Sequence, residues 1–367
     1  MRITTTKEKI LNAVSLVERV VGKKETLPVL SCVLIDVGKT ISVRATNLEA
    51  GIDVVVPGEI EEKGMIAVPA AILSQTLKST NGDKVTFKDE EENLLVEARG
   101  ARTVVKAVPH NEFPSIQHDV GGGNTVMVSR ERLLEGIQSV VYAASPSMIR
   151  PELGSVYVSI SSKELICVAT DSFRLAEKRI LGASADDVEA DVLIPLKHAV
   201  ELSHILDRIE DESIQLSLDE SQLSIQGSGV SYTSRVVDGT FPNYKEIIPK
   251  KTTSEATVLR GDLIEVLRKA RVFSGAEQHV GLHIYPKKKL FSVTARSGDV
   301  GEMSDSIDAA LEGDDLDINF HIGYLTDCLP GIGSDSVVLS FGGVGKPLII
   351  RGASDNSFTY LVMPLNR

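Results

Sequence analysis

One sequence pattern occurs three times along the chain, and it constrains the fold more than any other feature. Its clearest copy, LICVATDSFRLAEKRI at 165–180, is typical of a strand, a polar corner at 170–172 and a second strand. Related segments occupy 41–56 and 290–307. Self-similarity at long spacing indicates a chain built from copies of one structural unit. We therefore expect three similar repeats within the 367 residues.

Helical patterns repeat in the same order as the strands, with two helices in each repeat. Apolar residues recur at helical spacing in both helices. The residues in register within the first helices are Leu11, Leu134 and Ile264. The residues that precede the second helices, at equal spacing, are Pro69, Pro195 and His321. With roughly eight strands beside each helix pair, the predicted fold class is α+β, three similar domains of two helices packed on antiparallel sheets.

A glycine run, and the points at which the pattern begins again, indicate where one repeat ends and the next begins. Gly121-Gly122-Gly123 is predicted to be a flexible joint, and a third round of the pattern begins near Ser254. We predict domains at 1–120, 121–250 and 251–367. Each helix keeps one polar face beside its apolar stripe. Six such faces are explained if the domains curve end to end and point all their helices at a common lumen.

Local patterns also make predictions for individual segments. The sequence TLPVL at 26–30 is predicted to start a strand, and the acidic stretch 89–92 is predicted to form a hairpin tip. The sequence GGVGK at 342–346 is similar to a phosphate-binding loop, but its spacing differs and a proline follows, so we expect a hairpin turn.

Composition excludes several classes of protein. The formal net charge of −12 argues against a protein that coats nucleic acid non-specifically, although it leaves room for a local basic surface. The three cysteines, Cys32, Cys167 and Cys328, lie in apolar runs and are expected to be buried thiols. The seven histidines show no metal-ligand spacing, and no catalytic constellation is found, so neither a cofactor nor an enzyme is expected. The N-terminus lacks a signal-peptide pattern, which predicts a cytoplasmic protein.

Basic residues gather at the helices. Those singled out are Lys23, Lys24, Lys78, Arg130, Arg132, Arg150, Lys197, His198, Arg268, Lys269 and Arg271. Solvated helix faces are one interpretation. If the repeats point these faces inward together, a basic lumen would instead hold a polyanion by shape and diffuse electrostatics.

Apolar residues gather around the polar corner at 170–172. They include Leu153, Leu175, Pro242, Ile247 and the C-terminal strand that ends at 361–365. Such a strand is usually tucked into its own core. The alternative is an exposed groove for a peptide, in which Met363 would offer adaptable contacts.

Four segments together carry a resemblance to a known family. They are TLPVL (26–30), ATDSFRLA (169–176), VDGTFPNY (237–244) and YLVMPL (360–365). The chain resembles the beta subunit of bacterial DNA polymerase III, the beta sliding clamp, along its whole length. The resemblance implies crescent-shaped protomers of three domains that pair head to tail into a dimeric ring around duplex DNA. It also implies a processivity factor without catalytic activity, whose partners are the replicative polymerase, the clamp loader and other proteins with a clamp-binding motif.

The resemblance also implies functional positions in this sequence. The family's peptide-binding pocket corresponds to Leu153, Thr170, Ser172, Phe173, Arg174, Leu175, Pro242, Ile247, Val362, Met363, Pro364 and Leu365. DNA contacts correspond to Lys24, Arg150 and Lys197, and the dimer interface to Thr103, Val105, Val272 and Phe273. The family commonly has other residues at Ser172, Phe173, Glu246 and Thr103. A repeat-built adaptor that binds peptides without encircling DNA is the alternative function.

Overall fold

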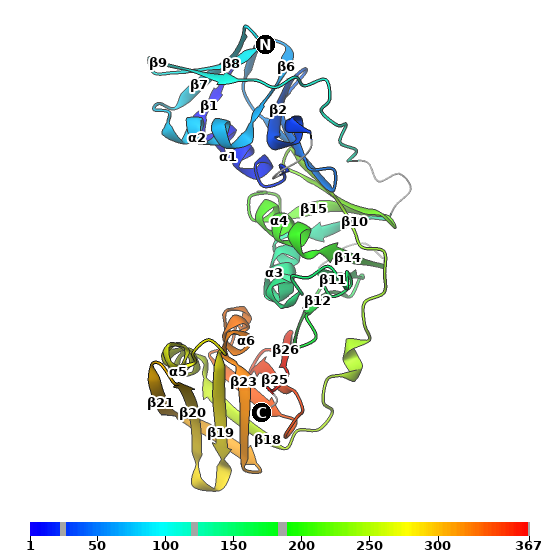
Figure 1. Ribbon diagram of the computed structural model, residues 1–367. Helices are drawn as coiled ribbons and strands as arrows, with labels where there is room; N and C mark the ends of the chain where they lie inside the picture. Colours follow the sequence, from blue (N-terminus) through cyan, green and yellow to red (C-terminus); the bar gives the residue numbers. More distant parts are fainter. Residues whose placement is uncertain (23–26, 119–123, 183–188, 366–367) are drawn as a thin grey trace. The chain divides into compact units, whose positions relative to one another are not determined.

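The structure is a computed structural model that describes residues 1–22, 27–118, 124–182 and 189–365. By internal contacts the chain divides into two compact units. Figure 1 labels their helices and strands. The first comprises 1–134, 184–190 and 197–238, and the second comprises 135–183, 191–196 and 239–367. These limits differ from the domain boundaries predicted above, which stay a prediction. Gly121, Gly122 and Gly123 lie outside the described residues.

The first unit holds two antiparallel sheets. The five-stranded sheet has the order β5 (Glu59–Glu62), β1 (Arg2–Thr6), β7 (Lys84–Glu90), β8 (Asn93–Ala98) and β9 (Ala101–Lys106). The eight-stranded sheet has the order β10 (Asn124–Ser129), β15 (Ser213–Leu218), β16 (Gln222–Gly227), β17 (Val230–Arg235), β4 (Ala50–Val56), β3 (Ile41–Thr46), β2 (Cys32–Val37) and β6 (Gly64–Pro69). The pairing of β17 with β4 joins strands from the first and second predicted domains into one sheet.

The second unit also holds two antiparallel sheets. The nine-stranded sheet has the order β14 (Ala190–Pro195), β11 (Ser155–Ile160), β12 (Glu164–Thr170), β13 (Arg174–Leu181), β26 (Phe358–Val362), β25 (Leu348–Gly352), β24 (Ser336–Phe341), β18 (Ser254–Leu259) and β22 (Ala309–Gly313). The four-stranded sheet has the order β21 (Gly301–Ile307), β20 (Leu290–Ser297), β19 (His279–Tyr285) and β23 (Leu316–His321). Here β13 pairs with β26, which joins the second predicted domain to the third.

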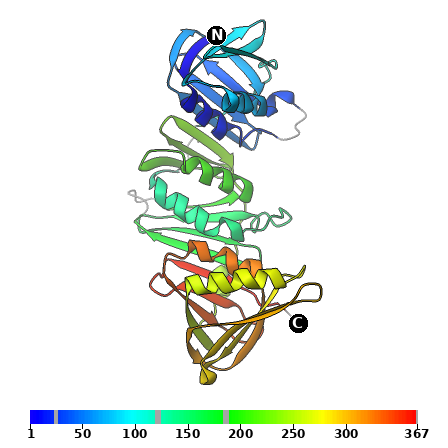
Figure 2. The ribbon, with the colours of Figure 1, turned by 90° about the vertical axis from the view of Figure 1, so that its left-hand side faces the viewer.

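Six α-helices occur in the described part of the chain. They are α1 (Lys7–Val17), α2 (Ala70–Ser79), α3 (Arg130–Val140), α4 (Leu196–Leu206), α5 (Arg260–Phe273) and α6 (Ile322–Asp327). The helices α1 and α2 pack against each other, as do α5 and α6, which lie side by side in Figure 2. Their apolar stripes are buried, as at Ile10, Val14 and Val17 of α1, while the opposite faces are polar.

The helix register predicted from the repeats is confirmed. Leu11, Leu134 and Ile264 each occupy the fifth position of their helix, in α1, α3 and α5. The residues Pro69, Pro195 and His321 each stand directly before the first residue of α2, α4 or α6. The three repeats therefore share their helix placement residue for residue.

The strand predicted at 26–30 is wrong. Thr26 lies outside the described residues, and Pro28–Ser31 forms a 3-10 helix before β2 begins at Cys32. Pro28 favours this turn because its ring fixes φ and its missing N–H is not needed in a first turn. The Ser31 hydroxyl then donates to the Pro28 carbonyl oxygen at 2.7 Å and stabilises the turn.

The remaining local predictions are confirmed. The acidic stretch forms the hairpin between β7 and β8, with Glu91 and Glu92 at positive φ in its turn. The glycine-rich stretch 342–346 connects β24 to β25 as a turn. Cys32, Cys167 and Cys328 are buried and free. No helix among the described residues is long and apolar enough to cross a membrane.

Candidate functional site

The turn between β12 and β13 is held rigid by its own side chains. The Thr170 hydroxyl donates to the Arg174 carbonyl at 2.7 Å and accepts from the Ser172 N–H at 3.2 Å. Asp171 Oδ1 accepts from the N–H groups of both Phe173 and Arg174 at 2.9 Å. Ser172 has φ of 77°, a left-handed conformation that costs a non-glycine residue roughly 1–3 kcal/mol. The turn is thus a preformed feature that its hydrogen bonds impose.

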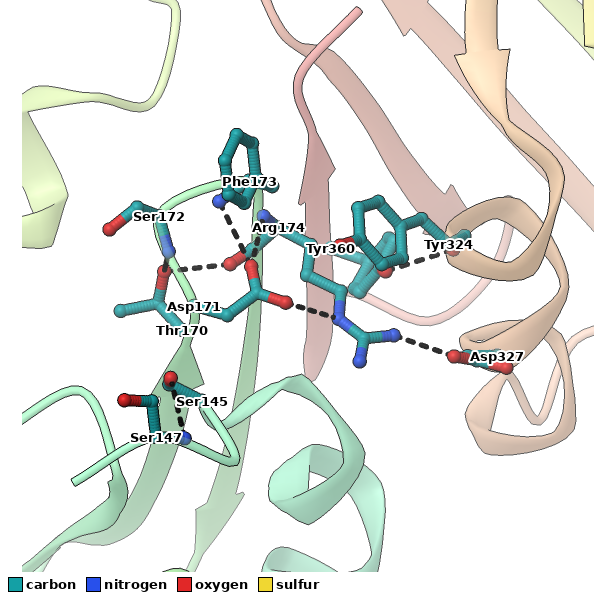
Figure 3. A network of polar contacts seen from close by, with 10 residues as sticks. All are labelled: Ser145, Ser147, Thr170, Asp171, Ser172, Phe173, Arg174, Tyr324, Asp327 and Tyr360. Carbon is teal, nitrogen blue, oxygen red and sulfur yellow. Dashed lines mark hydrogen bonds and ion pairs between the residues drawn. The ribbon is translucent and has the colours of Figure 1, made fainter. Parts of the chain in front are cut away.

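Arg174 connects this turn to α6. Its Nε donates to Asp171 Oδ2 at 3.0 Å and its Nη1 to Asp327 Oδ2 at 2.6 Å (Figure 3). The guanidinium lies 4.5 Å from the Tyr324 ring centroid, and only 12% of the side chain is exposed. Burial alone would lower the pKa of Arg174, but Tyr360 and the two carboxylates outweigh it and raise the pKa.

An apolar floor lies on the other face of the same strands. Leu175 of β13 and Leu361 of β26 are directly paired, so their side chains share one face of the sheet. Val168, Ile349 and Tyr244 complete this buried cluster. Tyr244 was missed by sequence reasoning, whereas Leu361 was named only as part of the apolar C-terminal strand. The alternation along β26 could have indicated Leu361, once its pairing with β13 was known.

Val362 lies on the face opposite to this floor. It pairs with Arg174, and its side chain has no exposed surface. Tyr360, two residues away on the same face, donates its hydroxyl hydrogen to the Tyr324 carbonyl oxygen at 2.8 Å. Val362 therefore supports the strand beneath Arg174 and offers no surface to a ligand.

The segment after β17 forms one wall beside the floor. Phe241 stacks on Tyr157, with ring centroids 5.2 Å apart, and the Tyr244 hydroxyl donates to the buried carboxylate of Glu177. Burial and the Glu177 carboxylate both raise the pKa of Tyr244, which keeps the phenol protonated. Pro242 is partly buried beside Phe241. The wall is therefore fixed by ring stacking and by one buried hydrogen bond.

Exposed apolar side chains surround the floor. Phe173 is 61% exposed, Ile247 54% and Met363 39%. Phe173 stands at the tip of the turn and points away from the Arg174 guanidinium (Figure 3). The Met363 N–H donates to the Phe173 carbonyl oxygen at 2.8 Å, which fixes the end of β26 to the turn. Large apolar groups held open to water at one place are typical of a recognition surface.

The other residues predicted for the pocket are less exposed. Leu153 and Thr170 are buried, and Pro364 and Leu365 are partly buried. The Leu365 N–H donates to the Asn319 carbonyl oxygen on β23 at 2.8 Å. The structure thus brings the turn, the wall and the chain end together within the second unit, while their role in binding stays a prediction.

The basic residues are in varied environments. Lys24 lies outside the described residues, as does Lys23. Arg150 is exposed and paired with Glu152 at 3.1 Å, and Lys197 is exposed with Glu201 at 3.8 Å. The exposed residues predicted for helix faces also include Lys78, Arg132, Arg268, Lys269 and Arg271.

Two of the basic residues are not solvated as the sequence suggested. His198 is buried, and burial lowers its pKa, so the ring stays neutral. Arg130 is partly buried and donates to the Leu206 and Asp211 carbonyl oxygens at 2.9 and 3.1 Å. Its guanidinium thereby satisfies one carbonyl group at the end of α4 and one in the segment that follows the helix. Neither side chain is free to meet a polyanion.

The residues predicted for a dimer interface lie at two sheet edges. Thr103 is exposed on β9, an edge strand of the five-stranded sheet, whereas Val105 of the same strand is buried. In the second unit, Val272 is exposed and Phe273 half-buried at the end of α5. The neighbouring strand β21 is an edge strand of the four-stranded sheet, and Lys269 of α5 pairs with its Asp305 at 2.9 Å. No cluster of metal-ligating side chains occurs among the described residues.

Comparison with known proteins agrees with this architecture over the whole chain. Models of the DNA polymerase III beta subunit match its N-terminal domain at 1–117, its central domain at 127–243 and its C-terminal domain at 245–366. The beta sliding clamps of Pseudomonas aeruginosa and Bacillus subtilis are 28% and 26% identical, over 100% of this chain and 100% and 99% of their own.

Solved structures give the same result. The DNA polymerase III beta subunit of Thermotoga maritima superposes with a TM-score of 0.93 at 26% identity, covering 100% of this chain and 99% of that one. The Pseudomonas aeruginosa subunit gives 0.90 at 26% identity, with both chains fully covered. The fold is that of the DNA polymerase sliding clamps. The chain belongs to the DNA polymerase III beta subunit family, and its function is that of a DNA sliding clamp.

Proposed function

We propose that two copies of this chain close head to tail into a ring around duplex DNA and tether the replicative polymerase to its template. The match of the family models to all three repeats carries this proposal. The ring would resist dissociation by topology and needs no tight grip on DNA. It would act in the cytoplasm, at the nucleoid, as a polymerase accessory factor without catalytic activity of its own.

The seam between the two copies would join the edge strand β9 of one copy to the edge strand β21 of the other. Both are unpaired at their outer edges within the described chain, and an edge strand is a template for pairing. The exposed Thr103 would lie in this seam together with Val272 and Phe273. Val105 is buried and would support β9 from beneath.

DNA contacts would come from Lys24, Arg150 and Lys197. Exposed ammonium and guanidinium groups attract phosphates diffusely, and salt screens the attraction within about 10 Å. Because Arg150 and Lys197 already have carboxylate neighbours, their pull on phosphate would be weak. Weak contacts suit a ring that slides, and the net charge of −12 opposes the binding of stray DNA.

Partners would dock at the turn between β12 and β13. A short linear motif containing Gln and Leu or Phe would place its apolar side chains over the floor that includes Leu175 and Leu361, between Phe173, Ile247 and Met363. The exposed apolar rim and the rigid turn support this use. The polymerase, the clamp loader and other motif-bearing proteins would compete for it.

Topological linkage tests the proposal directly. Labelled protein is loaded on a nicked circular DNA by a clamp loader from a related bacterium, washed in high salt, and the circle is then cut. We expect retention through the wash and release on linearisation, because ionic contacts alone do not survive the salt. The Val272→Ala/Phe273→Ala variant is the control, since a chain that cannot pair is not retained. A monomer in solution that never stays on the circle would favour the adaptor.

A further inference from the structure

A second hairpin repeats the geometry of the turn between β12 and β13 at residues 170–174, called the pocket turn below, hydrogen bond for hydrogen bond. It joins β3 to β4 over residues 46–50. The Thr46 hydroxyl donates to the Ala50 carbonyl at 2.8 Å and accepts from the Leu48 N–H at 3.1 Å. Asn47 Oδ1 accepts from the N–H groups of Glu49 and Ala50 at 3.0 and 2.7 Å. Leu48 has φ of 73°, as Ser172 has 77° in the pocket turn.

The surroundings of the second turn repeat as well. The Arg235 N–H donates to the Glu49 carbonyl oxygen at 2.8 Å, just as Met363 donates to Phe173 at 2.8 Å. Gly51 pairs with Thr233 where Leu175 pairs with Leu361. A Phe-Pro step follows in each case, at 113–114 and at 241–242. A cavity of about 330 Å³ lies at this junction in the first unit, lined by the turn, the end of β17 and residues 114–117.

The chemistry of this cavity differs from that of the apolar floor. Gly51 has no side chain and Ile116 packs on it, while Thr233 and Ser224 occupy the positions of Leu361 and Ile349. At the rim, Glu49 and Arg235 replace Phe173 and Met363. A pair of opposite charges thus stands where the pocket turn has an apolar pair.

The polar groups at this cavity are available to a ligand. The Glu49 carboxylate, the Arg235 guanidinium and the Gln117 amide make no hydrogen bond or ion pair with the residues that the structure describes. A volume of about 330 Å³ lies at the low end of the range in which proteins bind small ligands or a few peptide residues. Carboxylate pairs well with guanidinium, and ammonium with carboxylate.

We propose that this cavity is a second peptide site, which takes an extended segment carrying one acidic and one basic side chain. The segment's carboxylate would meet Arg235, its ammonium would meet Glu49, and Gln117 would bind its main chain. The proposal rests on the peptide role proposed for the pocket turn, because the two turns share one construction. Binding would be weak and salt-dependent, since both rim charges are exposed to solvent.

Isoleucine methyl groups report on the two sites separately. Ile116 lines the cavity and Ile247 lies at the rim of the apolar pocket. The full chain, isotope-labelled at isoleucine δ1 methyls, is followed by NMR during two separate titrations. One uses a peptide that alternates Asp and Lys, and the other uses a peptide containing Gln, Leu and Phe. We expect the charged peptide to move the Ile116 signal and the apolar peptide to move the Ile247 signal. Ile116→Val and Ile247→Val assign the two signals.

Charge removal tests the assignment of the rim. Glu49→Gln and Arg235→Gln should each weaken the affinity for the charged peptide about two- to fivefold, which is the range that exposed ion pairs contribute. Raising the salt concentration should weaken it further. Glu92→Gln and Arg99→Gln, which remove exposed charges in hairpin turns of the five-stranded sheet, are matched controls and should leave it unchanged.

Three results would overturn the inference. They are an unmoved Ile116 signal, equal binding by the Glu49→Gln/Arg235→Gln variant, and equal binding by a peptide of Asp alone. If the apolar peptide still moves Ile247, only the second site is wrong. If neither peptide moves its signal, the proposed pocket fails together with it.

Discussion

The two hairpin turns have nearly the same backbone and opposite side-chain layers. Beneath the pocket turn lie Val168, Leu175, Tyr244, Ile349 and Leu361. The corresponding positions beneath the second turn are Arg44, Gly51, Ile116, Ser224 and Thr233. Since the turn hydrogen bonds are the same, the two places differ in their side chains and not in their backbone. The repeat keeps the turn, and substitution on one face of the sheet changes the layer of side chains beneath it.

The two layers are also held together by different forces. Arg44 pairs with Asp36 at 3.1 Å and with Asp53 at 2.7 Å, so the polar layer is linked by partly exposed charges. In the apolar layer the one buried carboxylate, Glu177, is satisfied by the Tyr244 hydroxyl. Hydrophobic burial depends on area removed from water, whereas exposed ion pairs contribute little. The apolar layer should therefore be the more sensitive to truncation.

The largest expected difference comes from shortening the paired floor residues. Leu361→Ala should cost about 2–5 kcal/mol in the free energy of unfolding, because it leaves a cavity in a buried cluster. It should also abolish binding of the apolar peptide. Thr233→Ala, at the matching position, should cost about 1–2 kcal/mol by losing the hydrogen bonds to His118 and Ser224. Urea denaturation checks both, and equal costs would break the comparison.

Adding a methyl group should destabilise the polar layer beneath the second turn more than truncation does. A β-carbon built on Gly51 would lie 2.5 Å from Ile116 Cγ2, so Gly51→Ala should destabilise by about 1–3 kcal/mol through overpacking. Gly38→Ala is the control, because nothing lies within 4 Å of its added methyl. Adding Ile116→Ala to Gly51→Ala should recover part of the loss. The midpoint of urea unfolding measures each variant, and a neutral Gly51→Ala would mean that the two layers have similar room.

Removing the buried hydrogen bond of the wall should have a similar or smaller effect on the free energy of unfolding. Tyr244→Phe removes the donor to Glu177 and leaves a buried carboxylate less satisfied, at a cost of about 1–3 kcal/mol. Tyr285→Phe removes the same kind of bond, to Asp317 at 2.7 Å, at an exposed position and should be nearly neutral. Thermal unfolding compares the two. If both are neutral, the wall does not depend on this bond.

The smallest expected effect is a loss of stability in acid, which should differ between the surroundings of the two turns. Burial lowers the pKa of His118 and of His198, which contact Thr233 and the Arg235 carbonyl on β17. Each ring binds a proton more readily when unfolded, so its contribution to stability is complete above the ordinary histidine pKa of about 6.5 and falls as pH decreases below it.

Glu246 and Tyr324 occupy the matching places at the pocket turn, so that junction lacks these two imidazole rings. Its own His321, whose ring centroid lies 4.4 Å from that of Tyr324, has a pKa that burial also lowers, and this histidine is unchanged in the variant tested. Unfolding at pH 7.5 and 5.5 should therefore show a loss for the natural chain that His118→Gln/His198→Gln reduces. An unchanged pH dependence in that variant would place the acid sensitivity elsewhere. His283→Gln, which alters a histidine beside Asp317 on the four-stranded sheet, is a suitable control.

The repeats and helices could be predicted because they depend on local periodicity. The equal spacing of Pro69, Pro195 and His321 appears directly in the sequence and in the helix starts. The floor could not be predicted in full, because the face that Leu361 occupies depends on how β26 pairs with β13, far away in the chain. Val362 was predicted for the pocket, and the structure places its side chain on the opposite, buried face of β26.

Long-range polar contacts were also beyond the sequence. Nothing local indicates that Arg174 reaches Asp327 or that Tyr244 reaches Glu177, because each pair forms only after distant segments pack. The segment 41–56 was predicted to repeat 165–180. Its polar cavity could not be predicted, because the cavity forms only where the turn, the end of β17 and residues 114–117 pack together. TLPVL was assigned to a strand because its apolar pattern outweighed the signal of Pro28.

The unpaired edge of β9 has a consequence for assembly. If it pairs with β21, the joined surfaces are different ones, and such a contact is heterologous. Heterologous contacts produce either a closed cycle or an open filament, depending only on the rotation that each contact introduces. A small change in the angle between segments of this chain would then convert a finite particle into a fibre, without altering a single residue of the seam.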